Sequence, residues 1–172
     1  RRASSSGTLA SLIPYWAILG SHGRADEALA DIQRRPQAIR DDPAVLHIRG
    51  TIAKQFGRFE EATELFRRAL AKAPAAMQTW FALAMIKKFK PDDPDLAAME
   101  RLEKQAGAPA DARATLHYAL GKAVEDCGDV DRAFNQYAKG AALLRQQRPF
   151  DIERFGIAAE KVVADFTPEN LA

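Results

Sequence analysis

Apolar side chains recur every three or four positions along most of this chain, which is the spacing of one face of an α-helix. Ala and Leu are abundant, runs of Val, Ile and Thr are rare, and no segment alternates apolar with polar residues as a β-strand does. The pattern predicts an all-α protein. Its helices are expected at about residues 9–21, 24–35, 44–56, 59–72, 76–89, 95–106, 112–127, 130–147 and 151–165.

One short motif occurs three times, in the order Gly, polar, small or apolar, acidic, polar, Ala. It begins at Gly23, Gly57 and Gly128, and the first two copies are 34 residues apart. The third copy follows 71 residues after the second, which is two such periods with three residues inserted. A period of 34 residues is that of the tetratricopeptide (TPR) repeat. The sequence therefore predicts a right-handed α-solenoid of TPR helix-turn-helix repeats with a C-terminal capping helix.

The repeats are expected to differ in quality along the chain. The boundaries that we predict are a flexible tail at 1–8, a degenerate TPR at 9–42, a TPR at 43–76, a degenerate TPR at 77–111, a TPR at 112–147, and a closing helix with a linker at 148–172. Pro36 should end or kink the second helix of the first repeat. In the third repeat, the turn that contains Asp93 and Pro94 is longer than usual, and these two residues should start the next helix.

The repeat pattern also predicts how the helices pack. Each motif glycine should adopt the left-handed conformation that ends the first helix of its hairpin. Small residues are expected where the two helices cross, and large residues between hairpins. The small residues are Gly50, Ala62, Gly121 and Ala133, and the large ones are Phe59, Phe66, Trp80 and Tyr137. A single hairpin cannot bury its own apolar face, so stability requires neighbouring repeats.

The last third of the chain carries a more specific signature. The segment LHYALGK at 116–122 is followed by DRAF at 131–134 and by FTPE at 166–169. Together these segments resemble the repeat region of bacterial TPR-sulfotransferases. The resemblance implies that the chain is the non-catalytic repeat half of such a protein, and that 148–172 leads to a catalytic domain outside it.

The resemblance brings no catalytic residue to this chain. It has no P-loop, no dinucleotide fingerprint and no strand-loop-helix of the PRSGTT kind that binds 3′-phosphoadenosine 5′-phosphosulfate in that family. We therefore expect no enzymatic activity from this chain alone and no cofactor in it. The phosphosulfate donor would bind only if a sulfotransferase domain follows.

Charge, apolar pattern and cysteine content limit the kinds of partner and the compartment that we expect. The net charge is +2, which gives no electrostatic case for nucleic acid, so the expected partner is a protein, a peptide or the protein's own catalytic domain. The longest apolar stretch, 9–20, is interrupted by Pro14 and is too short to span a bilayer, so no membrane association is expected. The lone Cys127 excludes an internal disulfide and favours the cytoplasm, and we interpret it as a small core residue.

Function is expected on the concave surface that the first helix of each TPR lines. The candidate lining follows from the second, fifth, ninth and twelfth positions of those helices and comprises His47, Thr51, Lys54, Gln78, Phe81, Met85, Lys88, Thr115, Tyr118, Lys122 and Glu125. Lysines beside aromatic residues and a methionine suit an extended acidic or amphipathic peptide.

Three interpretations stay open at the level of sequence. The first is a scaffold that orients a sulfotransferase domain or its acceptor. The second is that the whole protein is a sulfotransferase with its active domain outside this chain. The third is a free-standing adaptor that binds a peptide in its concave groove, which requires that the closing helix, 151–165, does not fill that surface.

Two further groups of residues have structural interpretations. His117 occupies a helix-packing position of the repeat, and no His, Cys or acidic partner stands at the spacing of a metal motif. The acidic turn that contains Asp92, Asp93 and Asp95 lacks the Gly and the distal Glu of an EF-hand, so we expect helix capping there.

Overall fold

The computed structural model describes residues 8–105, 107–147 and 152–165, and within them it contains helices and no strands. The all-α prediction is confirmed. The helices are α1 (Leu9–Ser21), α2 (Ala25–Gln33), α3 (Gln37–Arg40), α4 (Pro43–Gln55), α5 (Phe59–Lys72), α6 (Met77–Ala84), α7 (Pro94–Glu103), α8 (Ala110–Asp126), α9 (Val130–Gln147) and α10 (Ile152–Asp165).

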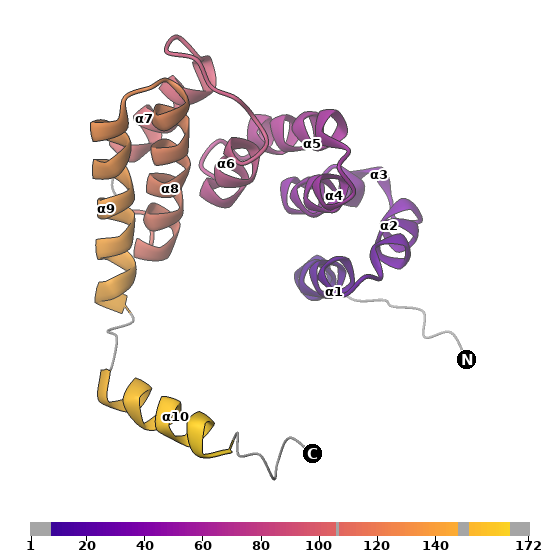
Figure 1. Ribbon diagram of the computed structural model, residues 1–172. Helices are drawn as coiled ribbons and strands as arrows, with labels where there is room; N and C mark the ends of the chain where they lie inside the picture. Colours follow the sequence, from indigo (N-terminus) through magenta and orange to yellow (C-terminus); the bar gives the residue numbers. More distant parts are fainter. Residues whose placement is uncertain (1–7, 106, 148–151, 166–172) are drawn as a thin grey trace.

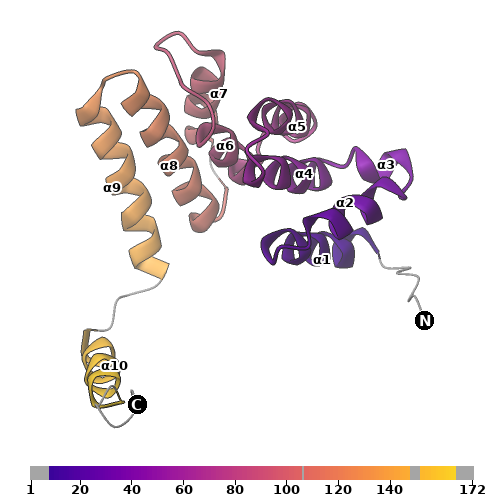
Figure 2. The same cartoon turned by 45° about the vertical axis from the view of Figure 1, so that its right-hand side comes forward.

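The helices form an α-solenoid (Figure 1). Antiparallel hairpins are made by α1 with α2, by α4 with α5 and by α8 with α9, and the hairpins contact one another through α1 with α4, α5 with α6 and α6 with α8. Helices α1, α4, α6 and α8 follow the inner side of the arc, and α2, α5 and α9 lie outside them (Figures 1 and 2).

The motif glycines end the first helix of each hairpin as the repeat predicts. Gly23, Gly57 and Gly128 have φ values of 74°, 72° and 85°, a region that residues with a Cβ atom rarely adopt. In the first two turns the amide of the residue that follows the glycine closes back on the helix, with Arg24 N donating to Leu19 O and Arg58 N to Ala53 O, each at 2.9 Å. The hairpin turns are therefore properties of local sequence.

Two glycines set how closely the helices of a hairpin approach. A Cβ atom on Gly50 would lie 2.6 Å from a ring carbon of Phe66, and one on Gly121 would lie 2.5 Å from the ring of Tyr137. Both glycines are helical, so their contribution is space and not conformation. The small residues therefore stand where the two helices of a hairpin cross, as predicted. Phe66 and Tyr137 were predicted between hairpins, but each ring lies within its own hairpin, on the backbone of the first helix, because the glycine leaves room for it there.

The core has two parts. The larger cluster runs from α4 to α9 and includes the fully buried Leu46, Phe66 and Met99. The smaller cluster joins α1, α2 and α4 around Trp16, which is completely buried and donates a hydrogen bond from Nε1 to Asp31 at 2.8 Å. Burying side chains of this size stabilises the fold by about 1.5–3 kcal/mol each.

Several element predictions were wrong in detail. Helix α2 ends at Gln33, two residues before the predicted end at 35. It stops before Pro36, as predicted, because proline cannot donate to a continuing helix, and a single turn, α3, follows. Helix α6 ends at Ala84 and not near residue 89. Helix α8 begins at Ala110, ahead of the predicted start at 112, because Pro109 supplies the residue before its first turn.

The position predicted for Phe59 was also wrong. Phe59 was expected between hairpins, but its side chain is 49% exposed, whereas Phe66 is fully buried and Trp80 is 7% exposed. Phe59 is the first residue of α5, directly after the turn at Gly57, at the exposed end of the hairpin.

The helix predicted to cap the array is present as α10, but none of its described side chains is buried. Its exposed apolar residues include Ile152, Phe155 and Val163, at 73%, 60% and 75%. Figures 1 and 2 both draw α10 apart from the hairpins. The capping contact is therefore not observed among the described residues. The predicted tail at 1–8 lies, except for Thr8, outside them.

Candidate functional site

The inner side of the arc carries a recess between α1 and α4, which we call the α1–α4 recess. Its volume is about 130 Å³, and its lining is mostly apolar. The lining residues are Trp16, Ala17, Gly20, Ser21, His47, Ile48, Thr51, Ile52 and Gln55. Two of the predicted groove residues, His47 and Thr51, therefore border one concavity.

Small residues of α1 create the space. Ala17 and Gly20 stand on the face of α1 that looks toward α4, and a Cβ atom on Gly20 would lie 3.2 Å from Cγ1 of Ile52. The floor is fixed, because Trp16 is held by its hydrogen bond to Asp31 on α2. The recess is thus a feature of well-packed helices and does not depend on a loop.

His47 is a polar residue of the recess lining that interacts with a neighbouring helix. Its Nδ1 lies 3.0 Å from Oγ1 of Thr79 on α6, and its ring is 5.6 Å from the ring of Phe66. Burial lowers the pKa of His47 below its ordinary value, and the positive charge of Lys54 lowers it further. His47 is therefore neutral at pH 7 and available for hydrogen bonding beside an apolar surface.

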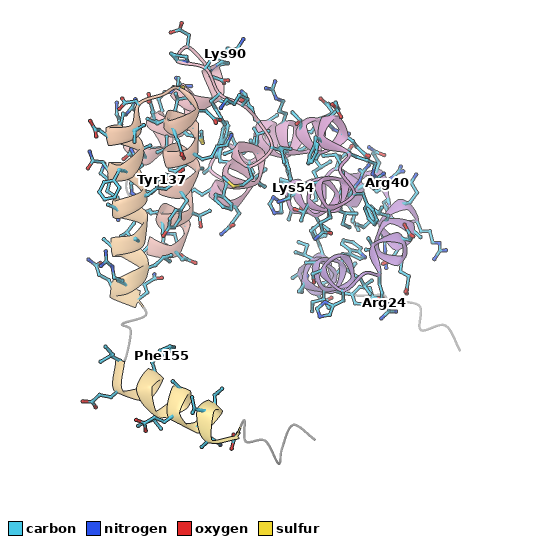
Figure 3. The ribbon with its side chains drawn as sticks, viewed as in Figure 1. Arg24, Arg40, Lys54, Lys90, Tyr137 and Phe155 are labelled. Atoms are coloured by element: carbon cyan, nitrogen blue, oxygen red, sulfur yellow. The ribbon has the colours of Figure 1, made fainter. Side chains whose placement is uncertain are left out.

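Lys54 supplies a positive charge near this surface. It lies one helical turn beyond Thr51 on α4, is half-buried, and makes no ion pair with any of the described residues. Figure 3 shows Lys54 on the α6 side of α4 and Arg40 on the opposite side. No carboxylate lines the α1–α4 recess. The local field therefore favours an anionic or acidic group.

The predicted groove residues of α6 lie farther along the inner side. Gln78 is exposed and donates to Oγ1 of Thr115 on α8 at 3.2 Å. Phe81 is half-buried and packs against the larger core cluster, whereas Met85, just after α6, is 40% exposed. These residues link α6 to α8 and leave little apolar surface for a ligand apart from Met85.

The two predicted groove lysines at the C-terminal side already have partners. Lys88 and Lys122 both donate to the carboxylate of Asp126, and Lys122 also donates to the backbone oxygen of Lys87. The carboxylate accepts a further hydrogen bond from the backbone N of Phe89 at 3.1 Å. Burial alone would raise the pKa of Asp126, but these hydrogen bonds outweigh it and lower the pKa. We call this group the Asp126 cluster.

Tyr118, another of the predicted groove residues, is half-buried against α9. Its ring is 6.3 Å from that of Tyr137, whose hydroxyl donates to Glu125 at 2.7 Å. Burial first, and then the hydrogen bond to Glu125, raise the pKa of Tyr137 to about 12. Tyr118 therefore takes part in the α8–α9 hairpin.

Sequence reasoning did not identify the α1 side of the recess, that is Trp16, Ala17, Gly20 and Ser21. A signal was present, because Ala17 and Gly20 lie 34 positions before Thr51 and Lys54. The first helix of the first repeat was not aligned because its large and small residues depart from the repeat pattern. Applying the period alone would have found the two residues.

The remaining candidates have structural roles. Nδ1 of the buried His117 is 2.7 Å from Oε1 of Gln136, and Gln136 donates in turn to Glu103. Asp93 caps α7 by accepting from Asp95 N at 2.9 Å, which agrees with the capping interpretation. Within the described ranges no group of His, Cys, Asp and Glu is placed to hold a metal ion.

Cys127 follows α8 and is half-buried. Its Sγ lies 3.2 Å from the backbone oxygen of Ala123, and burial raises the pKa of its thiol. This is the environment of a small core residue and not of an activated nucleophile.

Comparison with known proteins agrees with the helical repeat. The tetratricopeptide repeat model matches residues 43–86, which hold α4, α5 and α6. An uncharacterized protein of Aquifex aeolicus (strain VF5) is 25% identical to this chain over 118 residues. That alignment covers 69% of this chain but only 15% of the relative, so the chain spans a small part of the length of the protein it matches.

Each of the described helices is too short or too polar to cross a bilayer.

Proposed function

We propose that this chain is a protein-interaction scaffold that binds an extended acidic peptide along the inner side of its arc, with one apolar side chain of the peptide in the α1–α4 recess. The observation that carries the proposal is the recess itself, an apolar concavity bordered by His47 and Thr51. TPR repeats generally mediate contacts between proteins, and the matched repeat includes the α4 wall of the recess.

The size and chemistry of the recess define the anchor residue. Apolar cavities of about 150 Å³ accommodate a benzene-sized group, so a volume of about 130 Å³ suits a leucine or a residue of similar size. Ser21, Thr51 and Gln55 stand at the rim and can hydrogen-bond the backbone of an extended peptide. A carboxylate on either side of the anchor would be attracted to Lys54.

The test uses a library of unconstrained nine-residue peptides, each pool with one residue type fixed at one position. Binding of each pool to the protein is measured by fluorescence polarisation. Wild-type protein should select Leu, Ile or Met at one position and Asp or Glu near it. Ala17→Leu fills the recess and should weaken binding at least tenfold, by roughly 1.4 kcal/mol or more. Lys54→Glu should weaken binding and remove the preference for acidic neighbours.

The matched control is Ala30→Leu, the same substitution at an exposed position of α2 away from its buried face. It should bind as wild type does. Binding that survives both Ala17→Leu and Lys54→Glu, or a library in which no position shows a preference, would exclude this groove as the site.

A second candidate rests on the segments 116–122, 131–134 and 166–169, which resemble bacterial TPR-sulfotransferases. In this proposal the chain orients a sulfotransferase domain located elsewhere in the whole protein, and that domain binds 3′-phosphoadenosine 5′-phosphosulfate. Neither the matched repeat model nor the matched relative carries a sulfotransferase name. Calorimetric titration of 3′-phosphoadenosine 5′-phosphate into this chain and into a longer native chain that contains it provides the test. Binding by the longer chain alone supports this candidate, and binding by neither contradicts it.

A further inference from the structure

The C-terminal end of the array exposes an apolar surface on α9, which we call the α9 stripe. It follows one face of the helix, at spacings of three and four residues, and none of the described elements covers it. Its members are Val130, Phe134, Tyr137, Ala138, Ala141 and Leu144. Val130 and Phe134 are 68% and 70% exposed, and Leu144 is 38% exposed.

Helix α10 carries a second surface of the same kind, the α10 face. It comprises Ile152, Gly156, Ala159, Val162 and Val163, which share one side of the helix. Ile152, Val162 and Val163 are 73%, 54% and 75% exposed. The small residues Gly156 and Ala159 lie between the larger ones and allow another helix to approach closely, and no atom stands within 4 Å of a Cβ placed on Gly156.

The two surfaces match in length. The α9 stripe extends over 15 residues from Val130 to Leu144, and α10 has 14 residues, so each is about 21–22 Å long. Their borders carry opposite charge: Arg145 stands beside the α9 stripe and Glu160 beside the α10 face, and neither has an ion-pair partner among the described residues.

Apolar ends of a helical array are normally covered, because an open end repeat leaves the surface that would contact the next repeat in water. In both views α10 stands apart from α9, so the stripe and the face are open at the same time (Figures 1 and 2). A second copy of the chain can cover both surfaces at once, because its α10 face can lie on the stripe and its α9 stripe can receive the α10 face.

We propose that two copies of this chain form a two-fold dimer in which α10 of each copy lies on the α9 stripe of the other. The interface is isologous, because each copy gives its α10 face and receives its partner's. Exchange of a terminal helix is a low-cost route to a dimer, since it makes the same contacts that a capping helix would make within one chain. The inner side of the arc takes no part, so dimerisation is independent of peptide binding.

Light scattering coupled to size-exclusion chromatography, over roughly a hundredfold range of protein concentration, tests the proposal. Wild-type protein should elute as a dimer that dissociates on dilution. Phe134→Asp on the stripe and Val163→Asp on the α10 face should each weaken the dimer at least tenfold. Both residues are exposed, so the variants should keep the wild-type far-ultraviolet circular dichroism.

Two controls add the same charge off the interface. Asn135→Asp is next to Phe134 but outside the stripe, and Ala164→Asp is next to Val163 but outside the α10 face. Both should dimerise as wild type does.

A mixing experiment distinguishes exchange from other modes of pairing. The Phe134→Asp chain has an intact α10 face, and the Val163→Asp chain has an intact α9 stripe. A mixture of the two should therefore form heterodimers with one intact contact, although each variant alone is monomeric. A monomeric wild type, including one in which α10 folds back onto its own α9, would overturn the proposal, and so would a dimer that both variants leave unchanged.

Discussion

The backbone N of Phe89, in the connection after α6, donates a hydrogen bond at 3.1 Å to the carboxylate of Asp126 at the end of α8, 37 positions away in sequence. The ring of Phe89 is buried, and the amino groups of Lys87 and Lys122 lie 4.8 and 5.5 Å from its centre. The Asp126 cluster thus holds the long connection of the third repeat against the fourth.

Removing this carboxylate should destabilise the array. Asp126→Ala leaves Phe89 N without its acceptor and the half-buried Lys122 without its ion-pair partner, at a cost of about 1.5–3 kcal/mol in the free energy of unfolding. Asp126→Asn keeps an oxygen for Phe89 N and should cost less. Urea unfolding followed by circular dichroism measures both. The control is Glu64→Ala, an exposed residue of α5; equal unfolding of Glu64→Ala and Asp126→Ala would refute this role.

Replacing Gly50 by alanine should destabilise the protein although alanine favours helix. The new Cβ would lie 2.6 Å from a ring carbon of the buried Phe66, and such overpacking costs about 1–3 kcal/mol. Asn135→Ala is the control, since Asn135 is exposed on α9 outside the stripe and only helix propensity changes. Thermal unfolding should show a lower midpoint for Gly50→Ala alone. An unchanged midpoint would mean that Phe66 moves aside without loss.

Alkaline pH should remove stability through Tyr137. Its pKa is raised from 10 to about 12, first by burial and then by the hydrogen bond to Glu125, so the folded state keeps a proton that the unfolded state releases. The contribution is complete below pH 10 and is lost as the pH rises to about 12. Tyr137→Phe lacks this proton. The measurement is the difference in urea midpoint between the two proteins across this range, and parallel curves would contradict the assignment.

Mild acid should also remove stability, in this case through His47. Burial, with the charge of Lys54, lowers its pKa, so the unfolded state takes up a proton at about pH 6.5 that the folded state resists. Stability from this group is present above that pH and is lost as the pH falls through the lower folded pKa. His47→Gln keeps a hydrogen-bonding side chain without the titration and should lose less stability between neutral and acidic pH. A steeper loss in His47→Gln than in wild type would rule out the buried neutral imidazole.

The sequence by itself determined the hairpins. Gly23, Gly57 and Gly128 end the first helices because a positive φ is a local requirement that glycine meets, and Pro36 ends α2 because it lacks an N–H group. The 34-residue period placed Gly50 and Gly121 where the helices of a hairpin cross, but it assigned Phe66 and Tyr137 to the spaces between hairpins, and only the structure shows them against these glycines. It also placed His47 and Thr51 on the inner side, where they border the α1–α4 recess.

Only the tertiary structure decided which of these inner residues are open. Lys88 and Lys122 looked like groove cations in the sequence, but they pair with Asp126, and Lys88 does so across 38 positions of sequence. The end of α6, the recess beside Ala17 and Gly20, and the uncovered α10 face likewise depend on contacts between repeats, or on their absence. A periodic pattern describes each repeat, whereas these features arise where one repeat meets an irregular neighbour, and there distance in space is unrelated to distance along the chain.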